Sequence, residues 1–209
     1  MIAALLFAAL AGSSQLIVVT TPDWNATTGT LQRYEKRLLR WRAIGTPIDV
    51  VIGRTGLAAP GQKKEGDGKS PGGVFAIGTS FGFAESAGWK LPYLQLHETT
   101  ECVDDPESTF YNQIVERTPA ADWKSSEKMR SINQYKWGAV ISYNSPAKKG
   151  AGSCVFLHIA GRGATAGCTA MKEEDLLTLL RWIDPKKSPR IVQLPRDEYE
   201  RSRREWSLP

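Results

Sequence analysis

The sequence has few of the residues that most often bind metals: its 209 residues include three cysteines and two histidines. These residues show neither the C-x-x-C spacing of zinc ribbons nor the H-E-x-x-H spacing of metalloprotease helices, so neither class of site is expected. One zinc site stays open as an alternative, and its ligands would be Cys154, His158 and Cys168 with His97 or Cys102.

Long apolar runs are lacking as well. The run at the N-terminus, residues 1–11 (MIAALLFAALA), is too short to span a bilayer, which takes about 20 residues. Its end, Ala9-Leu10-Ala11, fits the small-x-small rule of signal peptidase, although no Lys or Arg precedes the run. The sequence therefore predicts a signal peptide over residues 1–11, with export to the periplasm or cell envelope. A buried N-terminal strand or helix is the alternative.

Charge of one sign is not concentrated anywhere in the chain. The net charge is +5 and the isoelectric point is about 9.1, but no dense Lys/Arg block with interleaved aromatic residues occurs. Nucleic-acid binding is therefore not expected, whereas a modest positive charge suits an anionic cell envelope. The sequence shows no internal repeat and no long polar linker, so residues 12–209 are predicted to form one domain.

The local patterns predict a mainly β fold. Apolar, β-branched runs indicate strands at residues 14–20, 31–43, 49–53, 74–77, 137–143, 153–159 and 190–194. Apolar residues at helical spacing indicate a helix over 172–183, and a short helix is expected over 123–130. The glycine-rich segment 57–73 is expected to be an exposed loop. The prediction is a β-sandwich or barrel with a few short helices, one of them following Cys168.

The segment from Ser153 to Met171 (SCVFLHIAGRGATAGCTAM) contains the candidate catalytic residues. His158 ends a predicted strand, and Cys168 follows ten residues later, after a glycine-rich turn. A free thiol has a pKa near 8.5, and an adjacent imidazole could take its proton to leave a nucleophilic thiolate. A helix beginning just after Cys168 would stabilise that thiolate, and the amides of Gly167 and Cys168 could form an oxyanion hole. A buried structural cysteine and histidine are the alternative on these residues alone.

This segment resembles the catalytic motif of the L,D-transpeptidase (YkuD-like) family. The matching residues are His158, Thr165, Gly167 and Cys168, and further pieces of the resemblance are residues 64–75, Asp104-Asp105-Pro106 and Tyr111-Asn112. The resemblance spans roughly residues 45–195. It implies a β-rich fold and a cysteine acyl-enzyme that attacks a peptidoglycan stem peptide between an L-centre and D-alanine. The acyl group would then pass to an amine or to water, with no cofactor.

The segment also differs from the family pattern. Ala166 stands where a second histidine is common, and Ala170 stands where Arg or Asn is usual. That basic residue helps to hold substrate in many members. Arg162, in the turn before Cys168, could supply the charge instead, and a solvated turn residue is the alternative for it. Thr165 is the other expected substrate contact. The short spacing from histidine to cysteine indicates a trimmed active-site loop.

The other candidate residues receive structural roles. In an oxidising compartment Cys102 and Cys154 would form a disulfide and leave Cys168 free, the alternative being two buried thiols. Asp104 and Asp105 are adjacent and so unsuited to paired-carboxylate catalysis, which favours a turn. His97 is expected at the surface.

The Gly68-Lys69-Ser70 sequence does not complete a phosphate-binding loop. This segment is expected to shape a turn instead, with Asp67 or Lys69 at the rim of the active-site cleft.

The prediction is thus a monomeric, exported L,D-transpeptidase acting on peptidoglycan stem peptides. Two alternatives remain. One is a carboxypeptidase or endopeptidase that uses the same nucleophile to hydrolyse wall peptides. The other is a catalytically idle module that only binds the cell wall.

Overall fold

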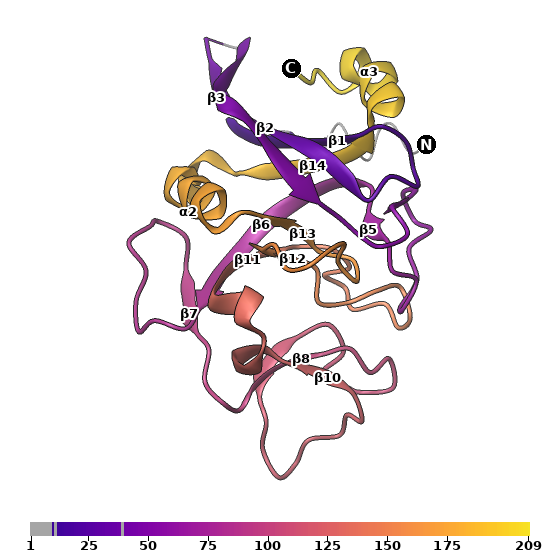
Figure 1. The fold of residues 1–209 in the computed structure, drawn as a ribbon, viewed down its shortest axis with the longest axis vertical. Coiled ribbons are helices and arrows are strands. Elements are labelled where there is room, and N and C mark those ends of the chain that lie inside the picture. The colour runs from indigo at the N-terminus through magenta and orange to yellow at the C-terminus, as the bar shows by residue number, and fades with distance from the viewer. Residues whose placement is uncertain (1–9, 11, 39) are drawn as a thin grey trace.

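The computed structural model describes residue 10 and residues 12–38 and 40–209. Apart from Leu10, the predicted signal peptide lies outside the described residues. The described part of the chain forms one large sheet, two small sheets and helices that pack at the edges of the large one (Figure 1). No helix among these described residues is both long and apolar enough to cross a membrane.

The large sheet has nine strands in the order β11-β12-β13-β3-β2-β1-β14-β6-β7, and an additional pairing of β11 with β6 closes it on itself. Its strands are β1 (Gln15–Thr21), β2 (Thr28–Arg37), β3 (Arg40–Val51), β6 (Gly73–Gly82), β7 (Tyr93–Gln95), β11 (Trp137–Ile141), β12 (Phe156–Ile159), β13 (Thr169–Met171) and β14 (Arg190–Pro195). This closed, mainly β architecture confirms the predicted fold class.

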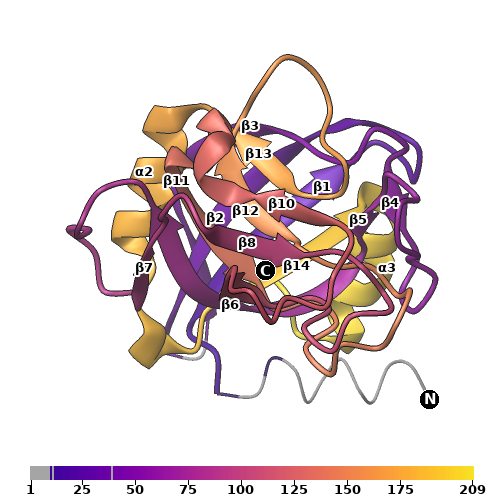
Figure 2. The same cartoon turned by 90° about the horizontal axis from the view of Figure 1, so that it is seen from below.

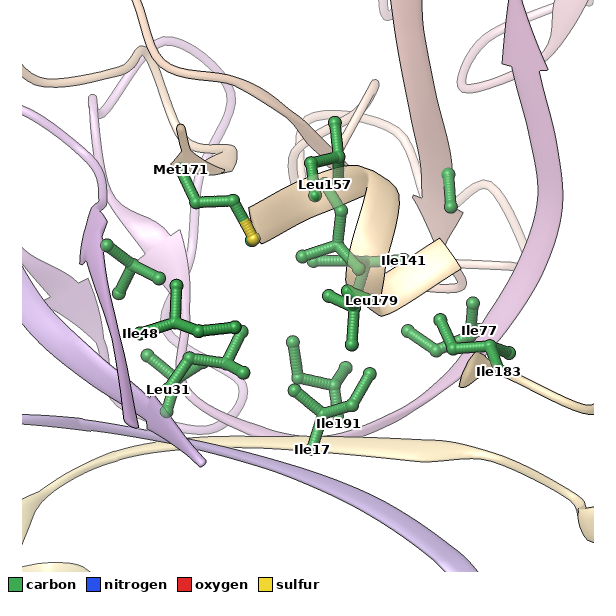
Figure 3. Packing of buried hydrophobic residues seen from close by; sticks show 14 of the residues in the cluster. Ile17, Leu31, Ile48, Ile77, Ile141, Leu157, Met171, Leu179, Ile183 and Ile191 are labelled. Carbon is green, nitrogen blue, oxygen red and sulfur yellow. The ribbon is translucent and has the colours of Figure 1, made fainter. Parts of the chain in front are cut away.

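The core lies inside this curved sheet and is capped by helix α2 (Glu173–Trp182). Leu176, Leu179 and Leu180 recur at helical spacing and are fully buried, because one face of α2 lies on the sheet. Figure 3 shows Leu179 among isoleucine and leucine side chains from the surrounding strands, including Ile17 and Ile191. The first turn of α2 is acidic, which suits the helix dipole.

The remaining elements form a second layer and the edges. A three-stranded sheet contains β8 (Thr100–Val103), β9 (Ile114–Glu116) and β10 (Ser126–Lys128), followed by the short 3-10 helices η1 (Met129–Ser131) and η2 (Asn133–Lys136). Figure 2 shows β8 and β10 crossing over the large sheet near β12. The short strands β4 (Leu57–Ala58) and β5 (Ser70–Pro71) form the third sheet, and η3 (Pro185–Lys187) precedes β14.

Three local predictions are corrected. Residues 123–130 hold β10 and the start of η1 rather than a helix, because Ser126–Lys128 pairs with β8. The segment 57–73 is not a wholly exposed loop, since Lys63 and Ser70 in it are buried.

The third correction concerns a helix. The helix near Cys168 does not begin directly after it, because β13 intervenes and α2 starts only at Glu173. The charged C-terminal segment forms helix α3 (Arg196–Glu205), and Tyr199 and Trp206 pack into a core beside β1 and β14.

Candidate active site

Parallel pairing of β12 with β13 brings His158 and Cys168 together. The register pairs Leu157 with Thr169 and His158 with Ala170, so Cys168 precedes β13 at the level of Phe156. Side chains alternate along a strand, which puts His158 on the same face as Phe156 and Cys168 on the same face as Ala170. Two paired strands with this two-residue offset place the Cα atoms of His158 and Cys168 about 8 Å apart, within reach of a histidine side chain.

The sulfur of Cys168 lies between two backbone groups of one neighbouring segment. Sγ accepts a hydrogen bond from the amide of Phe156 at 3.3 Å and donates to the carbonyl oxygen of Cys154 at 3.4 Å. Cys168 is only 6% exposed. Burial, followed by the negative charge of Glu127, raises the pKa of the Cys168 thiol to about 12. The raised pKa favours a neutral thiol at Cys168, whereas the sequence suggested a thiolate.

His158 is held in one orientation by the residue that follows it. Its Nδ1 lies 2.8 Å from the carbonyl oxygen of Ile159, and this oxygen can only accept a hydrogen bond. The proton of the neutral ring is therefore on Nδ1, which leaves Nε2 as a proton acceptor. Burial lowers the pKa of His158, so the neutral form is favoured. The group that orients the His158 ring is thus the backbone carbonyl of Ile159, which the sequence alone could not identify.

Two hydroxyl groups fix the backbone of the nucleophile. The carbonyl oxygen of Cys168 accepts a hydrogen bond from Ser70 Oγ at 2.9 Å and from Thr165 Oγ1 at 2.7 Å. Ser70 is fully buried and also accepts the amide of Gly53 at 2.9 Å. Sequence reasoning passed over Ser70, although it stands inside the 64–75 segment that carried the family resemblance.

Thr165, the predicted substrate contact, also has a structural role. Its hydroxyl is used within the loop, because Oγ1 also accepts the amide of Gly167 at 3.1 Å. Its backbone forms a bridge with Gly53 and thereby ties the loop to the end of β3. Since the Gly167 amide is already bonded, the expected oxyanion hole does not have both of its proposed donors free.

Gly167 permits a close approach of the 63–69 segment. A Cβ atom on Gly167 would lie 3.0 Å from the carbonyl oxygen of Lys69 and 3.5 Å from Lys63 Nζ. Lys63 is 7% exposed and forms an ion pair with Asp67 at 2.8 Å. Its positive charge acts to lower the pKa of Cys168, against the larger effect of burial. Lys63, which sequence reasoning did not single out, is therefore a buried cation beside the nucleophile.

A disulfide joins Cys102 to Cys154, and Cys168 is the free cysteine. The bond connects β8 to the segment that carries the carbonyl contact to the sulfur. Cys154 has a left-handed backbone (φ 51°), and its amide donates to Asn112 Oδ1 at 3.0 Å. Because two of the candidate zinc ligands are covalently joined, the alternative of a Cys/His zinc site is wrong.

Tyr135 and Glu127 also lie at the site, and the sequence gave no signal for either. Tyr135, in η2, packs its ring edge-on against His158 at 5.3 Å between centroids. Its hydroxyl donates to Glu127 Oε2 at 2.6 Å. The same hydroxyl acts as a hydrogen-bonding partner that lowers the pKa of Cys168. Tyr135 therefore packs on His158 and lies in the same buried cluster as Cys168.

Other predicted residues lie away from these contacts. Arg162 is exposed in the turn between β12 and β13, and His97 is exposed as expected. Asp105 accepts the amides of Lys124 and Glu107, which is a turn-forming role. Asp67 and Lys69 belong to the segment beside Gly167.

A cavity of about 520 Å³ lies on the β6–β11 side of this region. Phe156, whose amide contacts the sulfur, lines it together with Cys102, Asn112 and Tyr143, whereas neither His158 nor Cys168 is among its lining residues. The cavity therefore borders Phe156, whose amide contacts the sulfur, but not the sulfur of Cys168 itself.

Comparisons with known proteins identify the family of the chain. The family profile described as the L,D-transpeptidase catalytic domain (YkuD) matches residues 15–192, starting some thirty residues earlier than the motif resemblance. Comparison with curated proteins found no match. A solved structure entitled "Structure of Bdellovibrio bacteriovorus Bd1075" is similar at 14% identity and a TM-score of 0.48. The similarity covers 93% of this chain and 55% of that one, so the chain spans about half its length.

Proposed function

The chain belongs to the L,D-transpeptidase catalytic domain family, and from this premise we propose that it is a cysteine-dependent L,D-transpeptidase acting on peptidoglycan stem peptides. The observation that carries the proposal is the placement of His158 and Cys168 on the same face of two paired strands. Nδ1 of His158 is engaged by Ile159, so that Nε2 remains to accept the thiol proton.

In the first half-reaction, Sγ of Cys168 attacks the carbonyl carbon between the L-centre and D-alanine while His158 Nε2 takes the thiol proton. Both groups are neutral at rest, so this proton moves as the sulfur attacks, and no standing ion pair is needed. The developing oxyanion is stabilised by the amide of Cys168. His158 then returns the proton to the leaving amine, and D-alanine departs from a thioester on Cys168.

In the second half-reaction, an amine of another stem peptide attacks the thioester. His158 accepts a proton from that amine and delivers it to the departing sulfur, which restores the thiol. Water in place of the amine would give hydrolysis. Arg162, exposed in the adjacent turn, is the proposed contact for a carboxylate of the stem peptide.

The proposed location is the periplasm or cell envelope. The Cys102–Cys154 disulfide supports it, because such bonds persist mainly in oxidising compartments. Peptidoglycan lies in the same compartment, so the enzyme and the proposed substrate would meet there.

Purified protein with an intact disulfide, incubated with a stem tetrapeptide with and without an amine acceptor, tests the reaction class. A crosslinked product formed only with the acceptor supports transfer, while free D-alanine alone indicates the carboxypeptidase alternative. Binding to sacculi without turnover, unchanged in Cys168→Ala, would indicate a wall-binding module. Tyr93→Phe is the control variant for Cys168→Ala. It removes a hydroxyl that donates to the Ala84 carbonyl, and we expect it to leave turnover unchanged.

A further inference from the structure

The hairpin of β2 and β3 ends in a tip that is basic and exposed. The described residues of this hairpin tip that are exposed are Lys36, Arg37, Leu38, Arg40 and Arg42. None of its basic side chains takes part in an ion pair within the described residues. The nearest acidic residue of the hairpin, Glu35, forms an ion pair with Lys187 at 3.0 Å instead. The hairpin tip therefore corrects the expectation that charge of one sign is nowhere concentrated.

Strand pairing at the hairpin tip brings like charges together. The register places Arg37 directly opposite Arg40. Like charges in directly opposite positions of an antiparallel pair destabilise it. Lys36 lies over the Trp41 ring at 5.3 Å, a contact that engages the ammonium without neutralising it. An anionic partner at the hairpin tip would relieve this repulsion.

Leu38, in the turn of the hairpin, has a conformation and an exposure that the fold itself does not reward. Its φ of 47° lies in the left-handed region, which glycine and asparagine adopt more readily than leucine does. Its side chain is 97% exposed, so it gains no free energy from burial within the protein. Burial of Leu38 in an apolar medium on binding would offset both costs.

Contacts at the base of the hairpin tip hold it against the body of the protein. Trp41 Nε1 donates to the carbonyl oxygen of Ser207, after α3, at 3.0 Å. Figure 1 shows the end of the hairpin, with α3 nearby, at one end of the long axis of the molecule, and β8 and β10 toward the other end. The hairpin tip can therefore meet a flat surface while the end with β8 and β10 points away from it.

We propose that the hairpin tip docks on an anionic phospholipid membrane. Its lysine and arginine side chains attract the negative headgroups, and Leu38 enters the boundary between headgroups and acyl chains. A soluble anionic polymer would satisfy the arginines but would leave Leu38 in water, so the exposed leucine favours the lipid. This docking surface lies apart from His158 and Cys168 and goes beyond the proposed function.

Sedimentation of the purified protein with lipid vesicles tests the proposal without any wall substrate. One set of vesicles contains equal amounts of phosphatidylglycerol and phosphatidylcholine, and the other contains phosphatidylcholine alone, both at about 0.1 M salt. We expect binding to the anionic vesicles to be tighter by at least about tenfold. The apolar run at residues 1–11 is the same in every variant, so differences between variants report on the hairpin tip.

Leu38→Asn separates docking from damage to the fold. Asparagine tolerates the left-handed backbone, so the urea denaturation midpoint should stay the same or rise. Binding to the anionic vesicles should nevertheless weaken by about tenfold, because the apolar side chain is lost. A defect in folding alone would not produce weaker binding in a protein of equal or greater stability.

Two double variants test the charge at the hairpin tip. Arg37→Gln with Arg40→Gln should weaken binding to the anionic vesicles by about 25-fold, since each basic residue near the surface contributes about fivefold. Lys124→Gln with Lys128→Gln is the matched control. It removes an equal charge from exposed residues in and beside β10, and we expect binding to be unchanged.

Equal affinity of Leu38→Asn and the parent protein would overturn the proposal and would indicate a site for soluble polyanions. Equal losses in the two double variants, or equal binding of the parent to both kinds of vesicle, would overturn it as well. Cys168→Ala should bind the vesicles as the parent does. Vesicle binding without an acyl-enzyme would therefore count against the proposed function alone, and an acyl-enzyme without vesicle binding against the docking surface alone.

Discussion

The carbonyl oxygen of Ile159 lies 2.8 Å from Nδ1 of His158 and decides which nitrogen of the ring can act as a base. The two atoms belong to consecutive residues of β12, so the contact is local to this strand. In the proposed mechanism, the base and its orienting group are set before substrate arrives, and Cys168 lies beside them as a neutral thiol.

The acid limb of the activity profile tests whether burial lowers the pKa of His158. With its pKa below the ordinary value of 6.5, the imidazole is mostly neutral and able to accept a proton at pH 6.5. Only at lower pH does protonation remove the base. We expect the acylation rate with a carbapenem to have its acid midpoint below pH 6.5. A midpoint above 6.5 would contradict the lowered pKa of His158, and His97→Ala, at an exposed histidine, should not move the midpoint.

Ser70→Ala should disturb the proposed active site, because it removes a hydrogen bond that holds the backbone at Cys168. It removes the hydroxyl that bonds the Cys168 carbonyl and the Gly53 amide, both in a buried position. Loss of these bonds should lower the free energy of unfolding by about 1–3 kcal/mol and slow acylation. Urea denaturation and stopped-flow acylation measure the two effects.

Ser145→Ala, at an exposed serine, is the matched control for Ser70→Ala. If the two variants behaved alike in both measurements, the role given to Ser70 would be wrong.

Removal of the disulfide should cost stability and loosen the support of the sulfur. The bond joins residues 52 apart, for which the loop-entropy model gives about 4 kcal/mol. The double variant Cys102→Ala, Cys154→Ala creates no new free thiol, so acylation still reports on Cys168. We expect a lower denaturation midpoint and slower acylation, since Cys154 carries the carbonyl that contacts Sγ. An acylation rate equal to that of the parent protein would show that the disulfide does not position the sulfur.

Acid should weaken the fold through Glu101, which is 2% exposed. Burial raises its pKa, but hydrogen bonds from Arg117, Ser126 and Trp123 outweigh burial and hold the pKa at about 2, below the ordinary 4.5. Its stabilising effect is therefore complete above pH 4.5 and is lost as the pH falls toward 2.

Urea denaturation across that pH range should show a smaller loss of stability in Glu101→Gln than in the parent protein. The variant should also be less stable at neutral pH, because the charged partner of Arg117 is gone. The same loss of stability in both proteins between pH 4.5 and 2 would contradict the assignment. Glu174→Gln is again the matched control for the removed charge.

The sequence was informative where local patterns determine structure. Period-two and apolar runs predicted strands that overlap β1, β3, β6, β11, β12 and β14, and helical spacing predicted α2. The ten residues from His158 to Cys168 were few enough to indicate a strand, a turn and a second strand that brings Cys168 back beside His158. These inferences depend on neighbours in the chain, so they could be made without a structure.

Contacts between distant segments could not be predicted in this way. Ser70 is 98 residues from the carbonyl it bonds, and Tyr135 reaches Glu127 only because η2 follows β10 across the face of β12. The 123–130 segment has polar residues suited to a helix start, but pairing with β8 overrides that preference. Lys63 was passed over because its burial results from packing against Gly152 and Gly167, neither of which is near it in sequence.

Intact-mass spectrometry of the unreduced protein after incubation with a stem tetrapeptide or a carbapenem tests the central claim most directly. The account predicts one covalent adduct, located on Cys168 by peptide mapping, and no adduct on Cys168→Ala. His158→Gln should form the adduct far more slowly, with its disulfide intact. An adduct on another residue, or none on folded wild-type protein with either reagent, would contradict the assignment of Cys168 as the nucleophile.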